Sequence, residues 1–324
     1  MKVPEKILGI DLGTTNSLVG VVDSGFPILF ADKNGSRITP SVVSYSPDDV
    51  PIVGEAAKRM LSISPESTIA SVKRKMGSKE SYHIHGKSMT PEQVSADILI
   101  HLRNVAEEAS GENFSKAVIT VPAYFNDAQR TSTKRAAEIA GLEVVRIISE
   151  PTAAAIAYGL DKMGDKSRIA VYDLGGGTFD VSILELSDGV FQVLSTSGDT
   201  ELGGDDVDAV LADFIYHKAE NKKLSEASVE VKILFSNAAR RCKEALSLAK
   251  EYELKIPFYD GQKSFEMIFG LDLFNQLVTP LIEKTVKHCQ KALMDSGLEK
   301  KDLVCSYSVS YTHLRAHETR EDLV

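Results

Sequence analysis

The sequence has few cysteines and no long apolar run. Three cysteines, Cys242, Cys289 and Cys305, occur far apart among 324 residues and in no metal-ligand spacing. This usage argues against a disulfide framework or a zinc site and suits a reducing compartment. No run of about 18 apolar residues could span a bilayer, and the N-terminal segment has no signal-peptide pattern. We therefore expect a cytoplasmic protein that does not enter the membrane.

Two kinds of binding motif are also missing. The net charge is −9 and no Lys/Arg block stands out, although K-R-K at 73–75 is locally basic, so nucleic acid is a poor candidate partner. The sequence contains no G-x-x-x-x-G-K-[ST], and no G-x-G-x-x-G opens a helix. Neither a P-loop nor a dinucleotide-binding fold is therefore supported.

Strand and helix patterns alternate along the chain. Apolar runs at 6–11 and 18–22, joined by G-T-T-N-S, indicate two strands and a tight turn. Capping and stop signals predict helices from Thr90 to Gly111, from Asn126 or Asp127 to Gly141, and from Pro151 to Gly159. Further strands are predicted at 117–121, 144–148, 168–173 and 181–186. This alternation indicates an α/β protein with helices covering a mixed sheet.

One short pattern occurs twice. I-D-L-G-T-T-N-S contains Asp11, and D-L-G-G-G-T-F-D begins at Asp173, each directly after an apolar strand. The separation is that of a domain, so we expect two similar lobes that each open with the same hairpin.

The repeated turns have the composition of phosphate-binding loops. Glycine lets backbone N–H groups approach a phosphate closely, and threonine hydroxyls add donors. An aspartate at the strand end would repel phosphate unless hydrated Mg²⁺ lay between them, so Asp11 and Asp173 imply a metal. A single G-G-G turn is more often only a flexible bend, but the repeat favours phosphate binding.

Four longer motifs carry a family resemblance: G-I-D-L-G-T-T-N-S, V-P-A-Y-F-N-D-A-Q-R, E-P-T-A-A-A-I-A-Y-G-L and D-L-G-G-G-T-F-D-V-S-I. Over about residues 5–304 the chain resembles the ATPase domain of the seventy-kilodalton heat-shock chaperones of the bacterial DnaK type. The resemblance implies an actin-like (ribonuclease H-like) ATPase fold with two similar lobes around a nucleotide cleft. It also implies ATP and ADP with Mg²⁺, and K⁺ as a further ion. Implied partners are unfolded polypeptides bound by a separate domain, a J-domain co-chaperone and a nucleotide exchange factor.

The resemblance also assigns roles to individual residues. It implies that Lys73 approaches the γ-phosphate, that Glu150 lies near the attacking water, and that Asp180 is a further acid of the site. Asp11 and Asp173 would hold Mg²⁺ through water, with Asp173 and Thr178 also counted as catalytic. Pro122 and Arg130 would relay nucleotide state to the partner domain. The implied nucleotide-binding residues are Gly13, Thr14, Thr15, Asn16, Gly175, Gly176, Gly177, Thr178, Gly203, Gly204, Lys243 and Ser247. Without the resemblance, Lys73 would be read as a surface lysine and Glu150 as a helix-dipole partner.

The expected lobes are 1–160, with a smaller subdomain at about 38–90, and 161–304, with a smaller subdomain at about 203–280. The second lobe is expected to be incomplete, because residues 305–324 have no glycine and no strand matching the family, and are interpreted as a foreign tail. His313 and His317 in this tail lack a third metal ligand.

Another departure lies within the second lobe. Arg240 stands where the family usually has glutamate, beside an unusual Glu244. This puts one ribose contact in doubt, although an arginine could equally contact phosphate or a neighbouring acid.

Three alternatives stay open beside the chaperone ATPase. They are an actin-like cytoskeletal protein, a sugar kinase of the same fold, and a fragment with intact motifs that cannot close around adenosine. The departures lead us to expect that the chain binds ATP weakly and hydrolyses it poorly.

Overall fold

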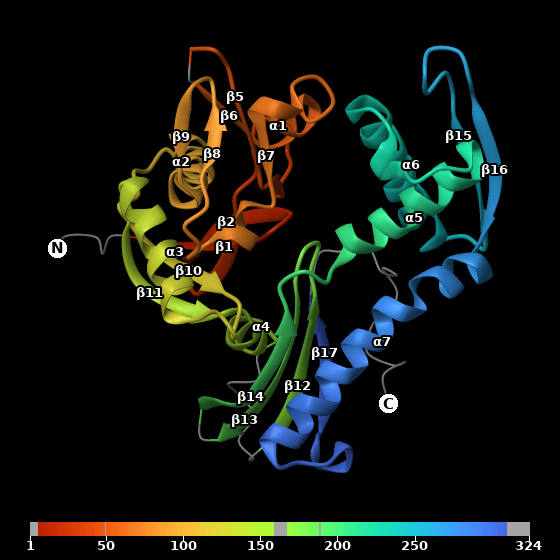
Figure 1. Cartoon of the computed structure of the whole chain (residues 1–324). Helices are drawn as coiled ribbons and strands as arrows, with labels where there is room; N and C mark the ends of the chain where they lie inside the picture. Colours follow the sequence, from red (N-terminus) through yellow and green to blue (C-terminus); the bar gives the residue numbers. More distant parts are fainter. Residues whose placement is uncertain (1–5, 49, 159–166, 188, 310–324) are drawn as a thin grey trace. The chain divides into compact units, whose positions relative to one another are not determined.

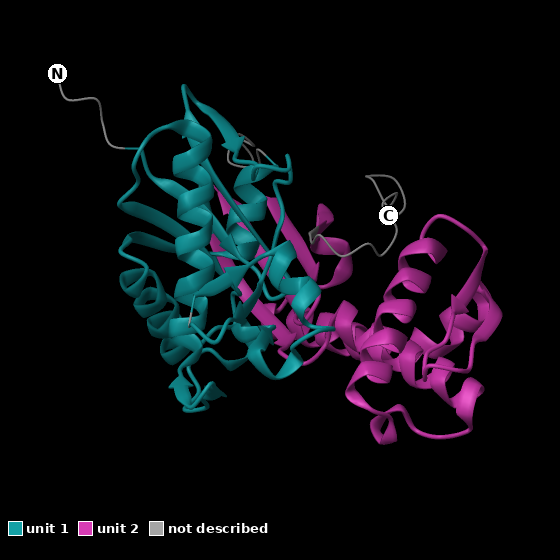
Figure 2. Cartoon of the chain, turned by 90° about the horizontal axis from the view of Figure 1, so that it is seen from above, with its two compact units in different colours: residues 1–164, 188–191 teal, residues 165–187, 192–324 magenta. Residues whose placement is uncertain are grey.

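The computed structural model describes residues 6–48, 50–158, 167–187 and 189–309 (Figure 1). The chain divides into two compact units, coloured separately in Figure 2: residues 1–164 with 188–191, and residues 165–187 with 192–324. We call them unit 1 and unit 2. Within the described ranges, no helix combines the length and the apolar character needed to cross a membrane.

The main sheet of unit 1 has the strand order β11-β10-β1-β2-β3, with β4 paired to β2. β1 is antiparallel to β2 but parallel to β10, and β10 is parallel to β11. The carboxyl ends of β1, β10 and β11 therefore share one edge of the sheet. The strands are β1 (Leu8–Leu12), β2 (Asn16–Asp23), β3 (Phe26–Leu29), β4 (Thr39–Pro40), β10 (Lys116–Val121) and β11 (Glu143–Ser149).

Two long helices of unit 1, α2 (Pro91–Ser110) and α3 (Asp127–Ile139), lie side by side (Figure 1). α2 starts with the predicted capping box on Thr90, and α3 starts after Asn126, one of its two predicted caps, which also forms a capping box. Gly111 ends α2 in the left-handed conformation, as predicted. The core they cover includes these fully buried side chains: Leu8, Ile10, Ile98, Leu99 and Ile119.

The third predicted helix begins one residue earlier than expected. α4 (Glu150–Ala157) starts at Glu150, directly after β11, and Pro151 is its second residue. The predicted stop, Gly159, lies outside the described residues.

The remaining elements of unit 1 are short and lie between residues 42 and 89. A three-stranded sheet has the order β6-β5-β7, and β8 and β9 form a hairpin. The bounds are β5 (Val42–Tyr45), β6 (Pro51–Val53), α1 (Glu55–Met60), β7 (Thr68–Ala70), β8 (Tyr82–Ile84) and β9 (Lys87–Met89), with 3₁₀ turns at Pro65–Ser67 and Val72–Lys75.

The main sheet of unit 2 repeats the arrangement seen in unit 1. Its order is β14-β13-β12-β17, in which β12 (Ser167–Leu174) forms an antiparallel hairpin with β13 (Phe179–Ser187) and pairs in parallel with β17 (Cys305–Val309). β14 (Val190–Asp199) lies on the other side of β13. Thus β12, β13 and β17 correspond to β1, β2 and β10, as the repeated sequence pattern predicts for the two hairpins.

The prediction that no strand follows residue 304 is wrong. Cys305–Val309 pairs with Ile169–Asp173, and Val304 N–H donates to the Arg168 carbonyl at 2.8 Å. The segment C-S-Y-S-V alternates, with Cys305 and Tyr307 half-buried and the serines exposed, which suits one half-covered strand. Pairing satisfies backbone groups of β12 that would otherwise form an open edge. Residues 310–324, with His313 and His317, lie outside the described residues.

The rest of unit 2 is mainly helical. α5 (Gly204–Glu220) packs on α6 (Val229–Leu246), and α6 packs on the hairpin β15 (Glu251–Ile256) and β16 (Phe265–Gly270) (Figure 1). The long helix α7 (Leu271–Ser296) packs on α5 and on β13. Short 3₁₀ turns occur at Leu224–Glu226 and Lys300–Asp302.

Candidate functional site

The turn between β1 and β2 is tightly built. A Cβ on Gly13 would lie 2.1 Å from the carbonyl oxygen of Asn16, so the turn has room only for glycine there. Ser41 supports the turn from outside, because its Oγ donates to the Gly13 carbonyl and its N–H to the Thr15 carbonyl, both at 2.8 Å. The two hydrogen bonds from Ser41 therefore hold the backbone of this predicted phosphate loop in place.

Two hydroxyls in this turn have no hydrogen-bond partner within the described part of the chain. The Oγ1 atoms of Thr14 and Thr15 are both buried and unpartnered there. A buried hydroxyl without a partner is costly, so such a pair fits a ligand that supplies acceptor oxygens. Phosphate oxygens meet that requirement.

Asp11 ends β1 beside this turn. The Thr120 hydroxyl, on the neighbouring parallel strand β10, donates to Asp11 Oδ1 at 2.7 Å. This bond fixes the orientation of the carboxylate. The second oxygen, Oδ2, takes no part in the bond. A half-buried carboxylate with an oriented oxygen is a suitable group to accept bonds from the water shell of Mg²⁺.

The predicted catalytic pair, Lys73 and Glu150, is brought together by the fold. The Lys73 Nζ donates to Glu150 Oε1 at 2.6 Å, and the two side chains are only 7% and 16% exposed. Lys73 lies in the 3₁₀ turn Val72–Lys75, which follows Ser71 in the left-handed conformation. Glu150 opens α4 at the same sheet edge where β1 ends.

The electrostatic surroundings raise the pKa of the Glu150 carboxyl above its ordinary value. Burial is the largest cause, the ammonium of Lys73 opposes it, and the negative charge of Asp11 adds to it. A carboxyl with a raised pKa is better matched to a general-base role than an ordinary glutamate. Lys73, Glu150 and Asp11 therefore form one electrostatic cluster in unit 1.

Arg130 and Pro122, the predicted relay residues, flank a segment that contacts this cluster. Arg130 donates to the carbonyls of Phe125 at 2.9 Å and Ala123 at 3.0 Å. The Phe125 ring lies 5.8 Å from Lys73 Nζ, a cation–π distance. Pro122 is buried directly after β10.

The second turn lies at the tip of the β12–β13 hairpin. Asp173 and Asp180 face each other across the hairpin, one pair before the turn Gly175–Thr178. The Gly175 N–H donates to the Thr178 carbonyl at 2.8 Å, which closes the turn. Asp180 is only 4% exposed, while Asp173 is half-buried.

Gly203 and Gly204 lie against this turn. The Gly204 and Asp205 N–H groups donate to the carbonyls of Gly175 and Gly176, at 2.9 and 2.7 Å. A Cβ on Gly203 would lie 2.5 Å from the Gly176 carbonyl oxygen. The start of α5 therefore packs on the glycine turn with backbone against backbone, and Gly203 permits that approach.

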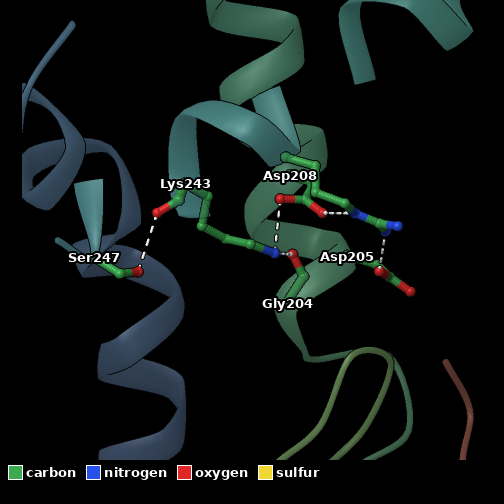
Figure 3. A network of polar contacts seen from close by, with 6 residues as sticks. Gly204, Asp205, Asp208, Lys243 and Ser247 are labelled. Atoms are coloured by element: carbon green, nitrogen blue, oxygen red, sulfur yellow. Dashed lines mark hydrogen bonds and ion pairs between the residues drawn. The ribbon is translucent and has the colours of Figure 1, made fainter. Parts of the chain in front are cut away.

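Lys243 and Ser247, the predicted nucleoside-side residues, lie on α6 and at its end, within a polar network (Figure 3). Lys243 Nζ lies 2.7 Å from Asp208 Oδ1 and donates to the Gly204 carbonyl at 2.8 Å. Ser247 Oγ donates to the Lys243 carbonyl at 3.2 Å. Arg240 contacts neighbouring acids, since it donates to Asp208 at 3.0 Å and to Asp205 at 2.8 Å.

Sequence reasoning missed three groups that this structure places at the two turns. Thr120 orients Asp11, Ser41 supports the first turn, and Asp208 joins α5 to Lys243 and Arg240. Thr120 lies directly opposite Asp11 on the neighbouring strand, so it could have been found only by predicting how the two strands pair. Nothing in the sequence separates Asp208 from the other acids of the D-D-V-D run at 205–208.

The predicted metal residues lie in separate units, Asp11 in unit 1 and Asp173 in unit 2. Across the described ranges, no group of three or more His, Cys, Asp or Glu side chains could hold a metal ion by direct coordination. Either carboxylate could contribute to a hydrated ion, which needs fewer protein ligands.

A comparison with protein families finds a match over most of the chain. The family model described as "Hsp70 protein" matches residues 7–83 and 78–305. The match includes both glycine turns, the Lys73–Glu150 pair, all of α5 and α6, and the first residue of β17.

Proposed function

Because the chain belongs to the Hsp70 family, whose members share an actin-like ATPase fold and use ATP with Mg²⁺, we propose that it is the ATPase region of a DnaK-type chaperone. The observation that best supports hydrolysis is the buried Lys73–Glu150 pair in the same unit as Asp11 and the unpartnered hydroxyls of Thr14 and Thr15. Positive charge, a carboxyl with raised pKa and phosphate-oxygen donors are the groups that phosphoryl transfer to water requires.

We assign the chemical step to residues of unit 1. The Lys73 ammonium would stabilise negative charge on the γ-phosphate oxygens as it develops. Glu150 would accept a hydrogen bond from the attacking water and hold or receive its proton at the carboxylate. Asn16 and the Gly13 backbone would complete the phosphate contacts made by Thr14 and Thr15.

Unit 2 contributes a second phosphate-binding turn in this proposal. Gly175, Gly176, Gly177 and Thr178 would donate to phosphate oxygens. Asp173 and Asp11 would bind the water shell of Mg²⁺, which supplies charge neutralisation at the phosphates when bound. Asp180 is assigned as a further acidic residue of the site, and K⁺ is a further ion in the proposal.

The nucleoside side is assigned to Gly203, Gly204, Lys243 and Ser247. We propose that ATP binds weakly there, because residues 305–324 contain no glycine for the turn that the family resemblance implies on the nucleoside side.

We further propose that ATP turnover drives binding and release of unfolded polypeptides by a separate domain. Family members work with unfolded clients and co-chaperones, and a J-domain protein and an exchange factor are the partners we assign here. We place the protein in the cytoplasm. Its free thiols, Cys242, Cys289 and Cys305, suit a reducing compartment.

Calorimetric titration with ATP and Mg²⁺, followed by phosphate-release measurements, tests the proposal. We expect binding weaker than micromolar and slow release of phosphate to water. Submicromolar binding would contradict the weak-binding part. Phosphate transfer to a sugar would favour the sugar kinase, and nucleotide-dependent light scattering the cytoskeletal alternative. Absence of both binding and hydrolysis at high protein concentration would overturn the ATPase proposal.

A further inference from the structure

Asp208 joins two helices of unit 2 through buried charges. It lies on the first turns of α5 and contacts two basic residues of α6, with Oδ1 at 2.7 Å from Lys243 Nζ (Figure 3) and Oδ2 at 3.0 Å from Arg240 Nε. The side chains of Asp208 and Lys243 are each only 6% exposed, whereas that of Arg240 is 33% exposed. Asp208 is thus the shared acceptor of the network.

Buried charges of this kind depend strongly on one another. Removal of one partner leaves the other charge buried without a counter-charge. This lowers the free energy of unfolding much more than removal of a surface ion pair does. Without Asp208, Lys243 would keep the Gly204 carbonyl as its partner among the described residues. Arg240 would keep Asp205, at 2.8 Å.

The network continues into the glycine turn. Lys243 holds the Gly204 carbonyl, and the Gly204 and Asp205 N–H groups hold the carbonyls of Gly175 and Gly176. Arg240 reaches the side chain of Asp205. A continuous set of hydrogen bonds therefore runs from α6 through the start of α5 to the turn Gly175–Thr178.

Arg240 makes the network close to balanced in charge. Asp205 and Asp208 face Arg240 and Lys243, so two acids meet two bases. Partial burial lowers the pKa of the Arg240 guanidinium, but the charges and hydrogen bonds of Asp208, Asp205 and Glu244 outweigh it, and the pKa is raised. A glutamate at position 240 would instead place a third acid beside this pair.

We propose that Asp208 is a positioning residue for nucleotide binding, which fixes the Gly175–Thr178 turn by anchoring Lys243 and Arg240. The proposal rests on the proposed function for its effect on ATP and ADP. Its structural half, that the charge on Asp208 orders the turn, applies to the nucleotide-free chain as well.

The test compares Asp208→Asn with wild type and with Lys263→Gln. Lys263 pairs with Glu220 at the far end of α5, so its substitution removes an ion pair of unit 2 that lies outside the network. Hydrogen exchange of the nucleotide-free proteins is measured at residues 175–178 and 203–206. Calorimetry with ADP and Mg²⁺, and with adenosine alone, measures binding.

For Asp208→Asn we expect exchange in both segments to be about tenfold faster, the effect of losing roughly one buried hydrogen bond. ADP affinity should fall by a similar factor and adenosine affinity should stay the same. Lys263→Gln should change neither. Equal weakening of ADP and adenosine, or exchange that rises throughout unit 2, would show only a structural role and would overturn the proposal.

Two further results distinguish failure of the proposed function from failure of the Asp208 proposal. If wild type binds no ADP, the proposed function fails, and the exchange measurement alone decides whether Asp208 orders the turn. If Asp208→Asn does not fold, Arg240→Gln replaces it, because the partly exposed guanidinium can be removed with less loss of burial. We then expect about threefold faster exchange at 203–206, in line with loss of a partly exposed charged bond; unchanged exchange would overturn the proposal.

Discussion

The ammonium group of Lys73 donates a 2.6 Å hydrogen bond to Oε1 of Glu150, although 77 positions separate the two residues. The contact joins a short 3₁₀ turn to the start of α4, at the edge of the sheet where β1 and its parallel neighbours end. It places the cation and the carboxyl of the proposed reaction in one buried pair, and it leads to the first two predictions.

Substitution of Lys73 should affect hydrolysis more than binding. We expect Lys73→Gln to lower single-turnover hydrolysis by about 10²-fold, the usual effect of removing one donor that stabilises developing negative charge. ATP affinity, measured by calorimetry, should change by less than about threefold, because the lysine acts on charge that develops in the transition state. Lys75→Gln, two residues away and paired with Glu80, is the matched control and should leave both quantities unchanged. Equal losses of binding and hydrolysis for Lys73→Gln would contradict a mainly catalytic role.

The raised pKa of Glu150 predicts a pH dependence of stability. Because the folded-state pKa lies above the ordinary value of 4.5, the folded protein binds more protons between these two values than the unfolded chain. The stabilising contribution is therefore full below pH 4.5 and is lost as the pH rises through the folded-state pKa. Urea unfolding across this window should show that loss in wild type but not in Glu150→Gln.

The same carboxyl can be observed directly. Carbon NMR titration of Glu150 should move its midpoint to higher pH in Lys73→Gln, because Lys73 lowers the pKa. A midpoint that moves to lower pH would show that another group controls the titration.

Gly13→Ala should destabilise unit 1. The new Cβ would meet the Asn16 carbonyl at 2.1 Å, a backbone atom that cannot move without opening the turn, and we expect a loss of about 1–3 kcal/mol. Gly9→Ala is the control on β1, the strand that leads into this turn, since its Cβ would have its nearest contact at 3.8 Å. Urea unfolding of the two variants should differ clearly, and equal stabilities would show that the turn is not constrained as described.

Tyr307→Asp should destabilise unit 2, whereas Ser306→Asp should not. Tyr307 is half-buried in β17 and Ser306 is exposed, so a charge is costly only at the first position. We expect a loss of about 1 kcal/mol or more for Tyr307→Asp and a change within about 0.5 kcal/mol for Ser306→Asp. Similar small effects in both variants would support the original interpretation of this segment as a foreign tail.

Local signals in the sequence predicted local structure well. Thr90 identifies one helix start because the cap and its N3 partner lie within four residues, and Asn126 is one of the two caps predicted for the next helix. Pairings between distant segments could not be read in this way. The spacing of Lys73 and Glu150 carries no sign of their contact, and the family resemblance implies a role for each residue but no bond between them.

Two features that the sequence did not predict, β17 and the role of Asp208, have a similar cause. The strand β17 was missed because its short alternating pattern gains its stability from the edge of β12, which lies far away in the sequence. Asp208 was missed because an acid near a helix N-terminus is ordinarily explained by the helix dipole. In both, tertiary contacts decide the role of residues that are locally unremarkable.

The pairing of β12 with β17 has a consequence for the order of folding during synthesis. The β1–β2 hairpin gains its parallel neighbours, β10 and β11, within the first half of the chain, whereas the β12–β13 hairpin gains β17 only near the end of the described residues. Distant pairing is slow because loop closure precedes the contacts that stabilise it. On the ribosome, the strands of the first sheet can therefore pair early. The edge of β12 that binds β17 stays without that partner until Val309 has left the exit tunnel.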